Sequence, residues 1–447
     1  MDSIGDKFPM ENMVKKLLVI LCYLVIQLAA RFVFAQDTLP NKFVIVHPYQ
    51  LSRMITVGGS GADINGFTST AIQIGIDALK TQGGGLVKLS PGIFEIMAPV
   101  KLADNIVLSG SGPETVLHKV DGVKTNFIVD ADYGELVLTV ADPMGFLTGM
   151  GIQIYDKVQM EECWNVTTAV ITAMRGNLIY IDNYLVRDYH KDDEGIVSNA
   201  CSVISGVSVD EVRIADLTVD GNRGTNDYVN GCVGGGVYLH KVKNAVVENV
   251  KVRDWNGDGI SWQITENVTV KDCEVSGCDR GLHPGTGSPL SLIEGNDCHD
   301  NIYDGLYICW RVQSGIVRNN KFHHNGQYGI CTGHKDTDML FVDNHIYENG
   351  SDGVNLREEP DFNAPHRSIF RNNVLENNGT KGSGYGFSFQ SKAEGVILEN
   401  NVIRDTGKGT QKAGVFIDKN AFPVILTGNK FSGHPEGDLI DKTKEKQ

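Results

Sequence analysis

The chain has 447 residues, of which 40 are basic and 55 are acidic, giving a formal net charge of -15. An acidic chain of this kind is not expected to bind nucleic acid or an anionic membrane surface. Its length is sufficient for two or three ordinary domains, or for one elongated domain if that domain is built from stacked repeats.

The first 35 residues have the pattern of a secretory signal peptide. Two lysines precede an apolar run at 17–30, and Ala35 ends a cleavage site of small residues. The run is short and is broken by Arg31, which argues against a membrane span, although a retained N-terminal anchor is the alternative. We therefore expect residues 36–447 to form the folded domain. The mature protein would be secreted, periplasmic or at the cell surface, without stable membrane association once the signal is removed.

A helix is expected just after a glycine-rich segment at 58–66. A hydroxyl side chain at 68–70 can cap it, and its apolar residues recur with helical spacing until the glycines at 83–85 end it. These apolar residues are Ile72, Ile76 and Leu79. Such a helix would cover the open end of a stack of strands. Short alternating strands then begin at Leu86.

Residues 135–188 are expected to form a small antiparallel β insertion. Short strands follow one another closely there, with turn residues such as those at 175–177 between them, and no longer repeat is visible.

From Gly236 to Lys419 a segment of the form Gly, apolar, variable, apolar, polar occurs eight times, at intervals of 22 to 33 residues. A second strand follows each copy, and an asparagine recurs at its end, where stacked side chains can hydrogen-bond from coil to coil. The recurring asparagines are Asn296, Asn320, Asn373, Asn401 and Asn429. Two strands per coil with apolar alternation predict an all-β fold, a right-handed parallel β-helix.

Particular segments outside this repeat carry a family resemblance. They are the helix start at 70–73, the glycines and strand at 83–87, Pro91-Gly92, and the run at 108–112. Together with the Asn-rich coils, they make the chain after residue 50 resemble the pectate-lyase-like superfamily of β-helix proteins. That superfamily includes pectate and alginate lyases, polygalacturonase-type hydrolases, uronan C5-epimerases and non-enzymatic adhesins. The resemblance implies a polysaccharide or oligosaccharide substrate and leaves the reaction open.

The repeat also aligns outward-facing side chains into columns. In each Gly-led strand the first and third residues after the glycine are apolar and point inward, so the second and fourth point outward. Neighbouring coils lie about 4.7 to 4.9 Å apart, so residues of one column are within reach of each other. The coils that begin at Gly281, Gly305, Gly329 and Gly353 collect aromatic rings, imidazoles, cations and carboxylates on one face. Such a face suits a sugar ring, which has an apolar side and a polar rim.

These columns supply the candidate site residues. The candidates for catalysis are His283, His334, Lys335, Arg357 and Glu358. The candidates for substrate binding are Gln263, Tyr307, Trp310, Arg311, Asp336, Glu359, Gln390 and Lys392. The alternative is that the charged residues only pair with one another across coils.

Lyase and C5-epimerase reactions begin in the same way. A base removes the proton next to a uronate carboxylate, and a cation neutralises that carboxylate. An imidazole or Lys335 could be the base, Arg357 or Arg311 the cation, and Tyr307 could return a proton. A like charge on Arg311 would lower the pKa of Lys335 and help it act as a base.

Two other functions fit the same fold. A polygalacturonase-like hydrolase would need two carboxylates that flank the scissile bond, and a non-catalytic glycan-binding surface protein would need no base at all. Because cations and imidazoles outnumber well-placed carboxylate pairs on this face, we expect a lyase or epimerase. No metal site is predicted, although the resemblance leaves Ca²⁺ open.

Overall fold

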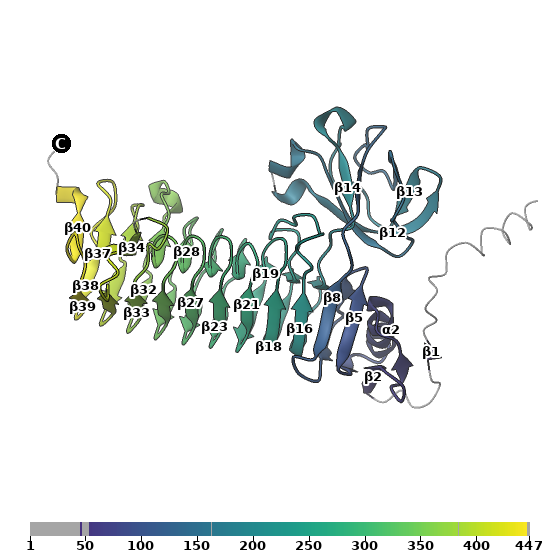
Figure 1. Ribbon diagram of the computed structural model, residues 1–447, viewed down its shortest axis with the longest axis horizontal. Coiled ribbons are helices and arrows are strands. Elements are labelled where there is room, and N and C mark those ends of the chain that lie inside the picture. Colours follow the sequence, from purple (N-terminus) through teal and green to yellow (C-terminus); the bar gives the residue numbers. More distant parts are fainter. Residues whose placement is uncertain (1–44, 47–52, 162, 383, 445–447) are drawn as a thin grey trace, which may run out of the picture. The chain divides into compact units, whose positions relative to one another are not determined.

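The computed structural model describes residues 45–46, 53–161, 163–382 and 384–444. The predicted signal peptide at 1–35 lies outside the described residues. Residues 44–447 cluster as one compact unit, in which parallel strands stack coil upon coil from helix α2 towards strand β40 (Figure 1). None of the helices in the described part of the chain is long and apolar enough to cross a membrane.

The Gly-led strands form a parallel sheet of eleven described strands. Its strands are β6 (Val100–Lys101), β15 (Ile204–Val207), β17 (Val237–His240), β19 (Ile260–Gln263), β22 (Leu282–Gly285), β25 (Leu306–Tyr307), β28 (Ile330–Thr332), β31 (Val354–Leu356), β34 (Gly384–Phe389), β37 (Gln411–Ile417) and β40 (Leu439–Asp441). The register places equivalent residues of successive coils side by side, as where Ser261 of β19 lies beside His283 of β22. The predicted columns are therefore present.

The remaining strands of the coils form a second, larger sheet. Its first strands are β1 (Ile45–Val46), β2 (Met54–Gly58), β3 (Ile64–Asn65), β4 (Gly85–Leu89), β5 (Gly92–Ile96), β7 (Ile106–Ser109), β8 (Thr115–Lys119), β16 (Arg213–Asp220), β18 (Lys243–Arg253), β20 (Glu266–Lys271) and β21 (Glu274–Ser276). The later ones are β23 (Leu292–Glu294), β24 (Asp297–His299), β26 (Ile316–Arg318), β27 (Lys321–His323), β29 (Leu340–Val342), β30 (His345–Tyr347), β32 (Ile369–Arg371), β33 (Val374–Glu376), β35 (Ile397–Glu399), β36 (Val402–Arg404), β38 (Ile425–Thr427) and β39 (Lys430–Ser432). Apart from the antiparallel pair of β1 and β3, its pairings are parallel, as in a β-helix.

The core lies between these sheets and is made of the inward residues of each coil. The first and third residues after the glycine, such as Val237 and Leu239 or Ile260 and Trp262, are fully buried. The assignment of inward and outward positions from the sequence is therefore confirmed.

Asparagine ladders run along the stack at two corners of the coils. In the first, the Nδ2 of Asn320 donates to Oδ1 of Asn344 and the Nδ2 of Asn344 donates to Asn373, each at 2.9 Å. This ladder contains the five predicted asparagines and also Asn344, which the sequence pattern left out. A second ladder was not predicted. It consists of Asn301, Asn325, Asn349, Asn378 and Gln411.

Helix α2 (Ser69–Lys80) is the helix expected at the start of the stack. Thr68 is its N-cap and accepts a hydrogen bond from the Ala71 amide at 3.2 Å. The predicted face of Ile72, Ile76 and Leu79 is buried.

The predicted antiparallel insertion is a sheet of six described strands that separates β8 from β15 in the chain. It contains β9 (Lys124–Asn126), β10 (Val137–Thr139), β11 (Gly151–Tyr155), β12 (Thr167–Arg175), β13 (Leu178–Ile181) and β14 (Ile196–Ser198). Its strands therefore extend beyond 135–188 on both sides. Short 3-10 turns are η1 (Gln159–Glu161), η2 (Cys163–Asn165), η3 (Lys191–Asp193), η4 (Asp361–Asn363) and η5 (Lys442–Lys444).

Candidate functional site

The outward face of β22, β25 and β31 holds a group of charged and aromatic side chains that we call the central cluster. It consists of Asp258, Arg280, His283, Tyr307 and Arg357. Asp258 and Arg280 each precede the glycine of a coil, His283 and Tyr307 are the second residue after such a glycine, and Arg357 follows β31. The register of one sheet thus brings together residues beside Gly259, Gly281, Gly305 and Gly353, with the coil of Gly329 lying between the last two.

His283 is oriented by a buried carboxylate. Its Nδ1 lies 2.6 Å from Oδ2 of Asp258, and the two side chains are 6% and 1% exposed. Because an ionised carboxylate only accepts hydrogen bonds, Nδ1 carries a proton, and whenever the ring is neutral the lone pair is on Nε2. Nε2 has no hydrogen-bond partner within the described ranges. This is the arrangement that a general base requires.

Asp258 is held in its ionised form. Burial alone would raise its pKa, but the hydrogen bond and charge of His283 and the charge of Arg280 outweigh burial and lower the pKa below its usual value. Arg280 lies 3.6 Å from Asp258 and 3.4 Å from Asp304. The acid that orients His283 is therefore charged at neutral pH.

Tyr307 lies between two guanidinium groups and beside His283. The guanidinium carbon of Arg280 is 4.2 Å from the centre of the Tyr307 ring, and that of Arg357 is 4.7 Å from it. The ring of His283 approaches Tyr307 edge-on, at 5.1 Å between centres. Burial raises the pKa of Tyr307 far above its usual value, so its hydroxyl keeps its proton.

Arg357 is the less completely paired of the two arginines. Its nearest carboxylate oxygens belong to Asp336 and Glu359, both at 3.9 Å, which is the outer limit of an ion pair. Its guanidinium also donates to the carbonyl of Ile308 at 3.1 Å, and it contacts Nδ1 of His334 at 3.3 Å and the thiol of Cys331 at 3.4 Å. The guanidinium can therefore accept a further anionic partner.

His334 differs from His283 because both of its ring nitrogens are occupied. Nδ1 accepts a hydrogen bond from Arg357 at 3.3 Å, and Nε2 lies 3.0 Å from Glu359. Burial and the charge of Arg357 lower its pKa, so the ring is neutral. Trp310 stacks on it at 4.9 Å between ring centres and remains 48% exposed. His334 therefore supports Trp310 and has no free nitrogen for proton transfer.

The turns that carry these residues have an unusual backbone. Trp310, Arg311, His334 and Lys335 have φ values of 73°, 63°, 45° and 65°. Two consecutive non-glycine residues in the left-handed region, on two neighbouring coils, store strain of a kind that is concentrated at functional sites.

Asp336 and Asp304 are buried acids beneath the cluster. Burial raises the pKa of Asp336 to about 7 and that of Asp304 to about 6. Asp336 accepts hydrogen bonds from the amides of Val312 and Gly333. Neither acid is more than 2% exposed, so both support the backbone and the arginines from below.

The other predicted residues occupy several different environments. Gln263 was expected to bind substrate, but it is fully buried and donates to the Gly231 carbonyl, since the segment before β17 covers it. Lys335 and Glu358 are exposed, and no hydrogen bond or ion pair in the described chain joins either to the central cluster. Lys335 instead lies 6.0 Å from the ring of Phe362.

Three more candidates lie at the edge of this face. Arg311 is exposed, with its guanidinium 5.6 Å from the ring centre of Trp310. Gln390 donates to Ser388 on the coil after Arg357, and Lys392 beyond it is exposed.

The sequence pattern placed neither Arg280 nor Asp258 among the candidate site residues. Both directly precede the glycine of a Gly-led strand, where the chain bends and the alternation of the strand no longer fixes the direction of a side chain. A charged residue recurs directly before the glycine of these coils, and this recurrence is the signal that could have identified Asp258 and Arg280. The recurring residues are Asp258, Arg280, Asp304 and Asp352.

The described residues contain no group of three or more His, Cys, Asp or Glu side chains arranged to hold a metal ion. The central cluster itself presents an oriented imidazole, two guanidiniums and a protonated phenol.

Comparisons with known proteins place this chain in a family. The model described as "Right handed beta helix region" matches residues 194–363 and 291–445. The chain is 26% identical over 221 residues to pectate lyase B of Colletotrichum gloeosporioides, covering 46% of this chain and 57% of that protein. It is 22% identical over 322 residues to mannuronan C5-epimerase AlgE5 of Azotobacter vinelandii, covering 70% of this chain and 23% of that protein.

A solved structure has the same fold. The A-module of mannuronan C-5 epimerase AlgE4 from Azotobacter vinelandii matches with a TM-score of 0.52 and 15% identity, covering 83% of this chain and 92% of that one. The chain spans 57% of the length of the first curated relative and 23% of the second. Because the family model covers more than half of its residues, the chain belongs to the right-handed β-helix family, as the resemblance to the pectate-lyase-like superfamily indicated.

Proposed function

We propose that the protein is an enzyme that modifies a uronic-acid-containing polysaccharide by removing the proton at C5 of a uronate, as a lyase or a C5-epimerase. The observation that carries this proposal is the Asp258–His283 pair beside two arginines that flank Tyr307. The similarity to a pectate lyase and to mannuronan C5-epimerases supports the same substrate class.

His283 is the proposed base. Its ring is fixed by Asp258 so that the unprotonated Nε2 can take the C5 proton, and the charge of Asp258 stabilises the imidazolium that forms. His334 is a weaker candidate, because Arg357 and Glu359 occupy both of its nitrogens. Lys335 is also weaker, because its exposed amine has no link to the cluster.

Arg357 is the proposed partner of the substrate carboxylate. When C5 loses its proton, the electron pair moves towards that carboxylate, and a guanidinium placed there stabilises the developing charge. Arg357 suits this role because its own acids lie at 3.9 Å, whereas Arg280 is held between Asp258 and Asp304. Arg280 would then position Asp258 and the ring of Tyr307.

Two outcomes can follow from the same carbanionic intermediate. If Tyr307 donates its hydroxyl proton to the opposite side of C5, the sugar is epimerised and no bond of the polymer breaks. If the electron pair instead forms a C4–C5 double bond, the oxygen at C4 leaves and the chain is cleaved by β-elimination. The protonated hydroxyl of Tyr307 can serve as the acid in either case.

Hydrolysis receives less support from the acids near the cluster. A hydrolase needs two carboxyl groups that reach the scissile bond from its two sides. Asp304 and Asp336 are no more than 2% exposed, and Glu359 is paired with His334. Glu358 is exposed and would stand alone.

The proposal is tested by incubating the protein with mannuronan, polygalacturonate and neutral glucans. A rise in ultraviolet absorbance from unsaturated uronate ends indicates a lyase, and a change of C5 configuration in the NMR spectrum without cleavage indicates an epimerase. Either activity should disappear in His283→Ala and persist in His118→Ala, whose histidine lies on β8 of the other sheet. New reducing ends without unsaturation would overturn the proposal in favour of hydrolysis.

A further inference from the structure

A second aromatic group lies on the same outward face, away from the central cluster. The ring centre of Trp164, in η2 of the insertion, is 5.7 Å from that of His240, the last residue of β17. Tyr238, on the same strand, stacks on His240, with 6.1 Å between the ring centres and an angle of 24° between the rings. In the eleven-stranded sheet β17 lies two strands from β22, which carries His283. An antiparallel insertion thus contributes a ring to the face that carries the proposed catalytic residues.

Trp164 is unusual among the tryptophans of this chain. It is 40% exposed and Trp310 is 48% exposed, whereas Trp255 and Trp262 are buried in the core. Each of the two exposed indoles contacts a histidine of the outward face, His240 in one case and His334 in the other. Flat apolar surfaces of this kind, held in place by a neighbouring ring, suit the apolar face of a sugar.

His240 provides an unused polar atom at the same place. Its Nε2 is buried and has no hydrogen-bond partner in the described chain. Burial, with a smaller contribution from the charge of Lys241, lowers the pKa of His240 to about 4, so the ring is neutral at physiological pH. A neutral imidazole with an unpaired nitrogen can hydrogen-bond a hydroxyl of a bound sugar.

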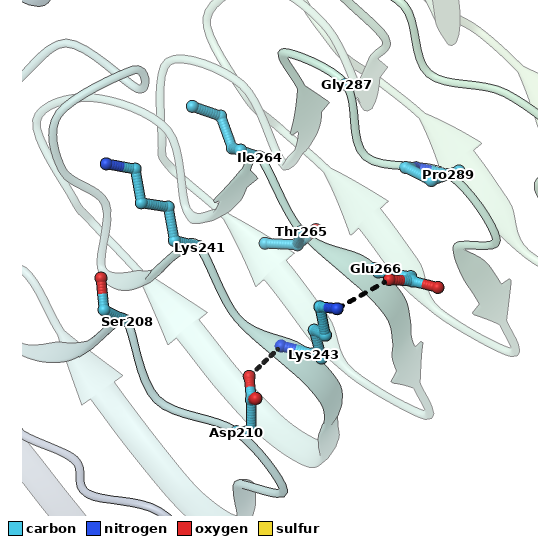
Figure 2. A pocket seen from close by; sticks show the side chains of 9 residues that line it. All are labelled: Ser208, Asp210, Lys241, Lys243, Ile264, Thr265, Glu266, Gly287 and Pro289. Carbon is cyan, nitrogen blue, oxygen red and sulfur yellow. Dashed lines mark hydrogen bonds and ion pairs between the residues drawn. The ribbon is translucent and has the colours of Figure 1, made fainter.

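Lys241 supplies a cation next to His240. It lines a hollow of about 530 Å³ at the turns after β15, β17, β19 and β22, where its side chain points away from Lys243 (Figure 2). Lys243 is neutralised by Glu266 at 3.4 Å, and its amide donates to Asp210 (Figure 2). Lys241 is exposed and makes no ion pair with any described residue. Its charge is therefore available to an anionic ligand.

We propose that Trp164, His240 and Lys241 form an accessory site for a second uronate residue of the polysaccharide chain that reacts at the central cluster. The sugar ring packs on the indole, one hydroxyl bonds to His240, and the carboxylate pairs with Lys241. Two strand spacings of about 4.8 Å separate this site from His283, so only an oligosaccharide reaches both. This inference rests on the proposed function, which supplies the class of ligand.

Binding is measured by calorimetry in the His283→Ala variant, so that turnover does not interfere. The ligands are uronate oligosaccharides of increasing length, from mannuronan and polygalacturonate. We expect affinity to rise with length and Trp164→Ala or Lys241→Ala to weaken binding of the long oligosaccharides about tenfold, with little effect on the shortest one that binds. Tyr133→Ala, which removes another exposed aromatic of the insertion, and Lys243→Ala, which removes the paired lysine, serve as controls.

A second readout follows the indole itself. In the Trp310→Phe variant Trp164 is the one remaining exposed tryptophan of the chain, so a long oligosaccharide should protect the fluorescence from a soluble quencher. Unchanged affinity in Trp164→Ala together with no protection would overturn the accessory site and leave the proposed function intact. Failure of every uronate oligosaccharide to bind, with no turnover by the unmodified protein, would overturn both.

Discussion

The hydrogen bond between Asp258 and His283 gives the sharpest test of the proposed base. Asp258→Asn keeps the shape of the side chain but removes its charge, and the new amide can donate to Nδ1. His283 would then carry its proton on Nε2, the nitrogen that has to be free. The substitution therefore changes which ring nitrogen of His283 carries the proton, while the imidazole itself stays in place.

The size of the effect follows from the bond that is lost. A 2.6 Å hydrogen bond to an ionised, buried group contributes about 1.5 to 3 kcal/mol. If that contribution is made mainly in the transition state, where the imidazolium forms, kcat should fall about 10- to 150-fold with little change in KM. Steady-state kinetics on the preferred uronan measure both constants.

Asp304→Asn is the matched control, because Asp304 also pairs with Arg280 but does not contact His283. We expect its kcat to fall much less than that of Asp258→Asn. Full activity in Asp258→Asn would refute the role of the pair. An equal loss in both variants would show that the acids act through Arg280 and not through His283.

Three further predictions concern the ladder, the cation and a buried acid. Asn344→Ala removes the acceptor of the Asn320 backbone N–H and of one N–H of its side-chain amide, which keeps its bond to Ile293, and it removes the donor to the Val317 carbonyl. Urea unfolding should therefore show a loss of about 3 kcal/mol or more, and a loss below about 1 kcal/mol would contradict the role of the ladder. Arg357→Lys keeps the charge but loses the planar fork, so kcat/KM should fall about tenfold or more, and unchanged kinetics would exclude Arg357 as the carboxylate partner. Burial raises the pKa of Asp336 to about 7, so between about pH 4 and pH 7 the folded protein holds a proton that the unfolded chain has lost, and the free energy of unfolding falls as pH rises. Asp336→Asn should remove this dependence on pH, which amounts to at most about 1.4 kcal/mol per pH unit. Urea unfolding at several pH values measures the slope, and an unchanged slope in the variant would contradict the raised pKa of Asp336.

The sequence was sufficient to predict the coils, because a fixed period and the alternation of strands are local properties. Val237 and Leu239 had to face inward once the glycine at 236 was recognised as the start of a strand. Asn344 was missed because the residues around it make its strand seem to end one residue later in the sequence than it does. The second ladder was missed although its sequence signal is equally regular, because each of its four asparagines follows an asparagine of the first ladder by five residues.

The site was predictable only where the strand fixed the direction of a side chain. His283 and Tyr307 are at outward positions of β22 and β25 and lie together as expected. Lys335 lies in a turn whose left-handed backbone directs it towards Phe362. Gln263 points outward from its strand, but a segment more than 20 residues earlier in the chain covers it. Long-range burial of that kind leaves no mark on the local pattern.

The central claim is that His283 removes the C5 proton of a uronate. It is tested most directly with a uronan labelled with deuterium at C5, by measuring the release of label into water. This readout detects a lyase and an epimerase alike. The unmodified protein and His118→Ala should release label at similar rates, and His283→Ala should release none while it still binds long oligosaccharides. Release by His283→Ala at the unmodified rate would contradict the account.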